Sequence, residues 1–167
     1  MLDHQYIRPG QDAIFFNQDF AGTHAPFISP EMFGEFAFPT VKARVEYIHD
    51  TFGKPVFKHA CGNNNSIIDM FIGARYDVYQ SIQESAHMDL VEFKEEYGDR
   101  MVPWGGMNVE NLISGSRFDV KKDVQRAMEK LKPGGRYFFG SSHSIAVGTK
   151  YDNFMTMVDE FEKLRHY

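Results

Sequence analysis

Short apolar runs alternate along the chain with longer segments in which apolar residues recur at helical spacing. Five such runs, rich in β-forming residues, lie at 13–16, 55–57, 78–79, 101–104 and 137–139. A helical pattern follows each run, and no polar or low-complexity linker interrupts the sequence. The alternation predicts five βα units in a single domain over residues 1–167. Strands that alternate with helices form a parallel sheet, which is either doubly wound or part of a barrel.

Residues with known positional preferences mark the ends of the predicted helices. Ser29 and Pro30 open a segment that reaches Phe52, and Gly53 follows it as a stop signal. Pro39 lies inside this segment and is expected to kink or divide it, because proline removes a helical hydrogen bond. The apolar spacing predicts further helices over 67–74, 90–97, 120–131 and 154–164.

The composition is that of a soluble globular protein. Of the 167 residues, 43% are hydrophobic and 25% are charged, and the formal net charge is -5. The sequence contains no basic run, whereas binding to a nucleic-acid backbone depends on clustered Lys and Arg. We therefore expect no nucleic acid among the partners.

The start of the chain is polar and carries Asp3, whereas a signal peptide needs a basic flank and an apolar stretch. No run is long and apolar enough to cross a membrane. We therefore expect a cytoplasmic protein without a membrane partner. Cys61 is the single cysteine, so it can form no internal disulfide, and its thiol is free for metal or redox chemistry.

Polar residues gather where the predicted strands end, namely Asn17 and Asp19, His59 and Cys61, Gln83 and Glu84, Asn108, and Ser141 and His143. Doubly wound sheets and barrels both place their sites at the carboxyl ends of the strands. We therefore expect a site assembled from several strands. Asn17 and Gln83 are candidate substrate contacts within it. Trp104, Gly105 and Gly106 form either a simple turn or a wall close to a ligand.

His59 and Cys61 stand two positions apart on the second predicted strand, so their side chains share one face. Imidazole nitrogen and thiolate sulfur are both good zinc ligands. Taken alone, the H-x-C spacing is more typical of a buried thiol beside a hydrogen-bonded histidine, because it is far less specific than paired C-x-x-C motifs.

The same alternation along the last strand puts Phe139, Ser141 and His143 on one side. If the strand ends converge, His143 joins the pair from the second strand in a zinc-like set of two nitrogens and one sulfur. Asp19 or Glu84 is then a candidate oxygen ligand. This convergence is an expectation that a structure can test.

Several motifs resemble the uroporphyrinogen decarboxylase superfamily, which also contains cobalamin-dependent methyltransferases. They are I-S-P-E-M-F at 28–33, K-P-V-F-K-H-A-C-G-N at 54–63, W-G-G at 104–106 and P-G-G at 133–135, with shorter matches over 88–100 and 142–143. The resemblance implies a (β/α)8 TIM barrel with its site at the carboxyl ends of the strands. The chain is about half as long as is usual for members of this superfamily, and it resembles the later part of their sequences. A partial barrel of about five βα units, from the C-terminal half, is therefore implied.

The resemblance also implies a set of zinc ligands. In the methyltransferase branch that the chain resembles, an H-x-C pair and a distant cysteine near the last strand are the zinc ligands. His59 and Cys61 match that pair. His143 stands where the distant cysteine is expected, and it resembles instead the histidine near the last strand of the decarboxylase branch. Zinc accepts imidazole in place of thiolate.

The implied function is zinc-dependent transfer of a methyl group between a corrinoid, such as methylcobalamin, and a thiol, with a corrinoid protein as partner. Asp19 or Glu84 would complete the resting coordination and leave when the thiol arrives, while Trp104 and the two glycines line the pocket. One alternative is a uroporphyrinogen decarboxylase, in which His143 lies near an acidic tetrapyrrole and no metal is needed. The other is a non-catalytic half-barrel fragment or subunit.

The implied architecture also predicts association. Five βα units do not close an eight-stranded barrel, so interior residues such as Phe15, Phe57 and Phe139 would face water. We therefore expect a two-fold homodimer, or a complex with a separate chain that supplies the missing half-barrel.

Overall fold

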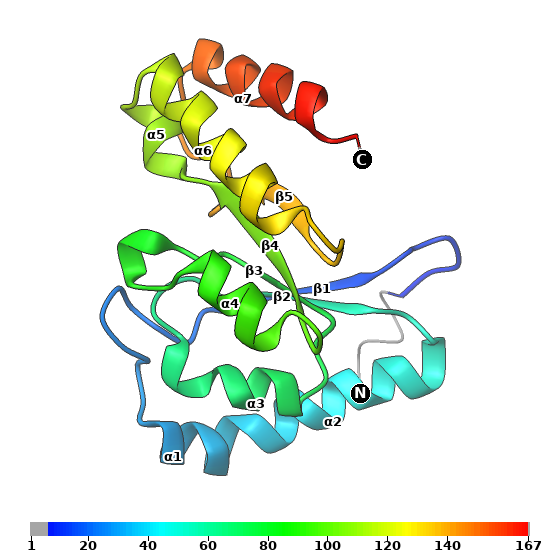
Figure 1. Ribbon diagram of the computed structural model, residues 1–167. Helices are drawn as coiled ribbons and strands as arrows, with labels where there is room; N and C mark the ends of the chain where they lie inside the picture. Colours follow the sequence, from blue (N-terminus) through cyan, green and yellow to red (C-terminus); the bar gives the residue numbers. More distant parts are fainter. Residues whose placement is uncertain (1–6, 167) are drawn as a thin grey trace.

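The computed structural model describes residues 7–166 and shows one parallel β-sheet with helices packed along it (Figure 1). The strands are β1 (Ile14–Asn17), β2 (Val56–His59), β3 (Val78–Gln80), β4 (Val102–Met107) and β5 (Phe138–Ser141). They pair in the order β1-β2-β3-β4-β5, and every neighbouring pair is parallel. A doubly wound sheet reverses its strand order at a switch point, whereas a barrel follows the chain. The predicted α/β fold is therefore confirmed as a section of a barrel.

The helices follow the strands along the chain, and all but the last lie between one strand and the next. They are α1 (Pro30–Met32), α2 (Phe38–Phe52), α3 (Ile68–Gly73), α4 (Leu90–Tyr97), α5 (Val109–Ile113), α6 (Arg117–Leu131) and α7 (Tyr151–Leu164). In Figure 1, α1, α2 and α3 lie below the sheet, and α7 lies beside α6 beyond β4 and β5. The sequence pattern does not predict α5, because five residues are too few to show helical periodicity. Within residues 7–166, none of the helices has the length and apolarity needed to span a membrane.

The long segment after β1 is divided near Pro39, as the sequence predicts. The Ser29 hydroxyl caps α1 by accepting a hydrogen bond from the Met32 N–H at 3.2 Å. A π-helical turn over Phe33–Ala37 follows. Pro39 then lies in the first turn of α2, where its missing N–H is not needed.

Lys58 of β2 is fully buried in the aromatic core between the sheet and the helices. Its Nζ donates a hydrogen bond to the Gln18 carbonyl oxygen at 2.5 Å and lies 4.7 Å from the centre of the Phe20 ring. Burial lowers the pKa of Lys58 to about 7, against the smaller, opposing effect of the Asp19 carboxylate. Alternation along β2 thus sends Lys58 into the core and its sequence neighbours to the opposite face.

The opposite face of the sheet carries aromatic side chains without a helix over them. Phe15 and Phe138 are 47% and 46% exposed, and both rings lie 6.1 Å from the Trp104 ring. Phe139, which the alternation was expected to expose, instead stacks on Phe161 of α7 with ring centres 4.8 Å apart. The prediction for Phe139 is wrong because β5 is shifted by one position relative to the expected alternation, so that Phe138 takes the open face.

This open face carries a prediction about association. Within the described sheet, β1 and β5 are edge strands with one neighbour each. We expect light scattering to give at least the mass of a dimer, because exposed aromatic faces and unpaired edges favour association. Phe138→Ser should weaken this association. Phe118→Ser should not, because Phe118, although 73% exposed, lies on α6 and not on the open face of the sheet. A wild-type monomer at micromolar concentration would contradict the prediction.

Candidate metal centre

The strand register places four candidate side chains in one row across the sheet. Asn17 of β1 lies opposite His59 of β2, His59 lies opposite Gln80 of β3, and Gln80 lies opposite Trp104 of β4. Asn17, His59 and Gln80 are the last residues of their strands, whereas Trp104 lies in the middle of β4. The row is the layer from which a site at this end of a barrel section is built.

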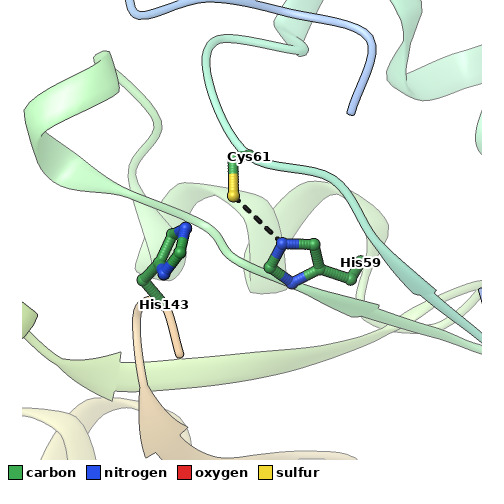
Figure 2. A group of neighbouring side chains, drawn as sticks. All are labelled: His59, Cys61 and His143. Carbon is green, nitrogen blue, oxygen red and sulfur yellow. Dashed lines mark hydrogen bonds between the residues drawn. The ribbon is translucent and has the colours of Figure 1, made fainter. Parts of the chain in front are cut away.

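His59, Cys61 and His143 come together above this row. His59 ends β2, Cys61 lies in the following loop, and His143 lies in the segment after β5, with the three side chains pointing toward one another (Figure 2). The His59 Nε2 atom is 3.0 Å from the Cys61 Sγ atom, and the two histidine ring centres are 5.6 Å apart. One ligand atom from each residue lies within 4.8 Å of the others. The expected convergence of these three residues is what the structure shows.

The orientation of the His59 ring is fixed by Gln80. The Gln80 Oε1 atom contacts His59 Nδ1, and an amide oxygen can only accept a hydrogen bond. Nδ1 therefore carries the proton, and the lone pair of Nε2 points toward Cys61. His59 is also buried, with 5% of its surface exposed, so its ring has little freedom to turn.

The Cys61 thiol is held by Ser81. The Ser81 hydroxyl lies 3.4 Å from Cys61 Sγ, and Ser81 has a positive φ of 81°, which is strained for a residue with a side chain. Burial raises the pKa of Cys61, outweighing the opposite effect of the Ser81 hydroxyl. The surroundings of Cys61 therefore favour the protonated thiol. A thiolate at neutral pH would need stabilisation by an added cation.

Asp19 lies beside the cluster and helps to position it. Its Oδ1 atom accepts a hydrogen bond from the Cys61 backbone N–H at 2.8 Å and lies 3.7 Å from His59 Nε2. The carboxylate is about half exposed. It adds negative charge next to the three candidate ligands, and its role as an oxygen ligand stays a prediction.

Two further predicted residues lie outside this cluster. Glu84 forms an ion pair with Arg126 of α6, so the structure does not bring its carboxylate to the candidate ligands. Gln83 accepts a hydrogen bond from the Gly62 N–H at 3.3 Å and thereby holds the loop that carries Cys61. Gln83 therefore helps to position this loop, and its role as a substrate contact stays a prediction.

A cavity of about 420 Å³ opens beside the cluster. His59, His143, Asn17 and Trp104 are among its lining residues, and α7 contributes apolar side chains to the opposite wall. Gly105 and Gly106 do not line it. A Cβ atom on Gly106 would collide with Tyr137 and Ala127, so the close packing there requires glycine, whereas one on Gly105 would make only an ordinary contact with Leu90.

The donor set fits zinc. Two imidazole nitrogens and one thiol sulfur are typical zinc ligands, and tetrahedral coordination separates neighbouring ligand atoms by about 3.5 Å. The three ligand atoms, all within 4.8 Å of one another, can reach that geometry by small side-chain rotations. With three protein ligands, a fourth position remains for a carboxylate, water or substrate.

The uroporphyrinogen decarboxylase (URO-D) family model matches residues 2–164, nearly the whole chain. The chain belongs to the uroporphyrinogen decarboxylase family. Among solved structures, this family member is similar to a methyltransferase from Methanosarcina mazei, with 20% identity and a TM-score of 0.75. The match covers 94% of this chain and 43% of that protein, so the chain spans less than half of its length. A search of curated proteins gave no match.

Sequence reasoning missed Gln80 and Ser81 as parts of the site. A signal for Gln80 was present, because it is a polar residue that directly follows two apolar strand residues. Ser81 gave no such signal, since its contact with Cys61 depends on its left-handed backbone conformation. Both residues act on the candidate ligands through hydrogen bonds.

Proposed function

We propose that this family member is a zinc-dependent methyltransferase that moves a methyl group between a corrinoid and a thiol. The observation that carries the proposal is the convergence of His59, Cys61 and His143, with ligand atoms within 4.8 Å of one another, at the carboxyl ends of the strands. The fold shared with the methyltransferase from Methanosarcina mazei supports it. The chain covers 43% of that protein, so the activity of a whole enzyme is part of the proposal.

A bound zinc ion would supply positive charge that stabilises a substrate thiolate near neutral pH. The remaining work falls to the chain. Gln80 orients the ring of His59 so that Nε2 faces Cys61, and Ser81 and Asp19 hold Cys61 through its Sγ atom and its backbone N–H. These contacts preorganise the donors before any ligand arrives.

The cavity beside the cluster gives the thiol access to the fourth position. Phe15 and Trp104 form an aromatic wall of this cavity, with their ring centres 6.1 Å apart. In the overall reaction the thiol loses its proton and gains the methyl group, and the electron pair of the broken bond stays with the corrinoid. A corrinoid protein would deliver its methyl group from the open side of the sheet.

The decarboxylase alternative has less support from the cavity. An acidic tetrapyrrole presents several carboxylates, which need Arg or Lys partners when they leave water. In the part of the chain that the structure describes, the residues that line the cavity include neither Arg nor Lys. We therefore favour the methyltransferase reaction over decarboxylation of a tetrapyrrole.

Metal analysis tests the proposed site. We expect one zinc ion per chain after purification without chelators, and Cys61→Ser or His143→Ala should weaken zinc binding by roughly 100-fold or more, because even the loss of an outer hydrogen-bond partner costs 10- to 100-fold. His24→Ala is the matched control, since His24 is exposed and outside the cluster.

The reaction is tested with the zinc-loaded chain, methylcobalamin and a thiol, by following loss of the methylcobalamin absorbance. Demethylation that depends on both Cys61 and His143 would support the proposal. A wild-type chain that binds no zinc, or binds it as well without Cys61, would overturn the metal site. If the chain binds zinc but transfers no methyl group to any thiol tested, the proposed reaction is wrong and the proposed metal site still stands.

A further inference from the structure

Within residues 7–166, which the structure describes, neither Lys nor Arg lines the cavity beside the candidate metal centre. It is lined by aromatic, apolar and neutral polar residues together with the two histidines of the cluster, and neither Lys nor Arg is among them. Lys58 and Arg126 are both directed elsewhere. The Lys58 ammonium is buried on the other side of the sheet against the Gln18 carbonyl, and Arg126 pairs with Glu84 at a separate cavity.

The same region already holds negative charge. The Asp19 carboxylate lies 3.7 Å from His59 Nε2, and Cys61 would bind a divalent ion as a thiolate. These two charges balance one divalent cation, and the two imidazoles add none. A substrate thiolate bound at the same place brings the local sum to minus one, and a second negative charge on its tail would find no partner.

The outer wall of the cavity is apolar. Ile145, which is 48% exposed, follows His143 closely in sequence and lines the cavity with Phe154 and Met157 of α7. Phe15 and Trp104 form the aromatic side, with ring centres 6.1 Å apart in an edge-to-face arrangement. An uncharged alkyl or aryl tail can remove water from these surfaces at no electrostatic cost.

We infer that the thiol substrate of this site is uncharged apart from its sulfur and carries an apolar tail. This inference rests on the proposed function, since it concerns the thiol that the metal centre would accept. It names the substrate class through two independent features of the chain, the apolar walls and the missing cation. An anionic group placed against these apolar walls gives up part of its hydration and finds neither Lys nor Arg among the described lining residues.

The experiment uses cobalt(II) in place of zinc, because cobalt(II) shows sulfur-to-metal absorption in the near ultraviolet when a thiolate binds. Loading of the wild-type chain is checked first through the spectrum of the ion itself. Two thiols of matched length are then titrated, 1-butanethiol and 3-mercapto-1-propanesulfonate. We expect 1-butanethiol to bind at least about tenfold more tightly, since an unpaired charge costs more than 1.4 kcal/mol.

A charge introduced into the cavity should reverse the preference. Ile145→Arg is expected to strengthen binding of the sulfonate by roughly tenfold, because it supplies the missing partner. Val147→Arg is the matched control, as Val147 is fully exposed and outside the lining, and it should leave the ratio unchanged. Circular dichroism checks that both variants fold.

The outcomes separate this inference from the function on which it rests. A wild-type chain that takes up cobalt(II) and binds both thiols equally would overturn the inference and leave the metal site intact. A chain that takes up no cobalt(II) would overturn both. An equal effect of the two arginine variants would show that general surface charge, and not the cavity, decides the preference, which also contradicts the inference.

Discussion

Phe33→Ala is expected to lower the free energy of unfolding by about 4 kcal/mol, the central value for removing a buried phenylalanine ring. Phe33 has no exposed surface, and its ring meets those of Phe20 and Phe71 edge to face, with centres 5.0 and 5.9 Å apart. These neighbours belong to the aromatic core that surrounds the Lys58 ammonium. The ring therefore has tightly packed neighbours that cannot easily collapse into the space it leaves.

Phe36→Ala is the control for this prediction, because Phe36 belongs to the same π-helical turn but is 66% exposed. Its replacement should change the free energy of unfolding by less than about 0.5 kcal/mol. Urea unfolding followed by circular dichroism measures both variants, and an unchanged denaturant slope shows that the same surface is exposed on unfolding. Equal effects at the two positions would mean that the π-helical turn is not packed as described.

Gly62→Ala is expected to destabilise the protein by about 3 kcal/mol and to lower its Tm by roughly 6–12 °C. Gly62 directly follows Cys61 and has a φ of +81°, a conformation that L-residues with a Cβ atom rarely adopt. A Cβ atom there would lie 2.5 Å from the carbonyl oxygens of both Ala21 and Gly22. The backbone would have to move, and the movement would displace Cys61 from the candidate ligands.

Gly53→Ala separates the collision from the backbone strain. Gly53 ends α2 with a φ of +59°, yet a Cβ atom on it would meet nothing within 4 Å. Only the left-handed strain, about 1 kcal/mol, applies there. Calorimetry should therefore give a clearly larger loss for Gly62→Ala than for Gly53→Ala. If the two losses are the same, the segment around Ala21 does not pack against Gly62 in solution.

The barrel section is well predicted from the sequence, because apolar residues recur at regular spacing in the strands and helices and typical capping residues mark the helix ends. His59 and Cys61 follow directly from alternation along a regular strand. The same reasoning fails in detail at β5, where it assigned Phe139 to the open face, because a strand of four residues leaves its register to packing against α7. His143 reaches the cluster from the turn beyond β5, so the strand's alternation does not determine its direction.

Electrostatic partners were also beyond what the sequence alone can give. Glu84 was a candidate ligand on position along the chain, yet Arg126, far away in sequence, pairs with its carboxylate. Conversely, the row formed by Asn17, His59 and Gln80 depends on strand register, which only the paired sheet defines. The position of a site residue could be predicted where the local strand geometry determines it. It could not be predicted where a partner far away in sequence determines it.

The separation of the candidate ligands along the chain has a consequence for how the protein folds. Between Cys61 and His143 lie β3, β4 and β5, so the two residues meet only after the last strand has docked. A metal ion held by both would act as a cross-link that closes this long loop, and closing a long loop removes much of the disorder of the unfolded chain. Metal uptake would then follow completion of the sheet, and the bound ion would keep its last strand from peeling away.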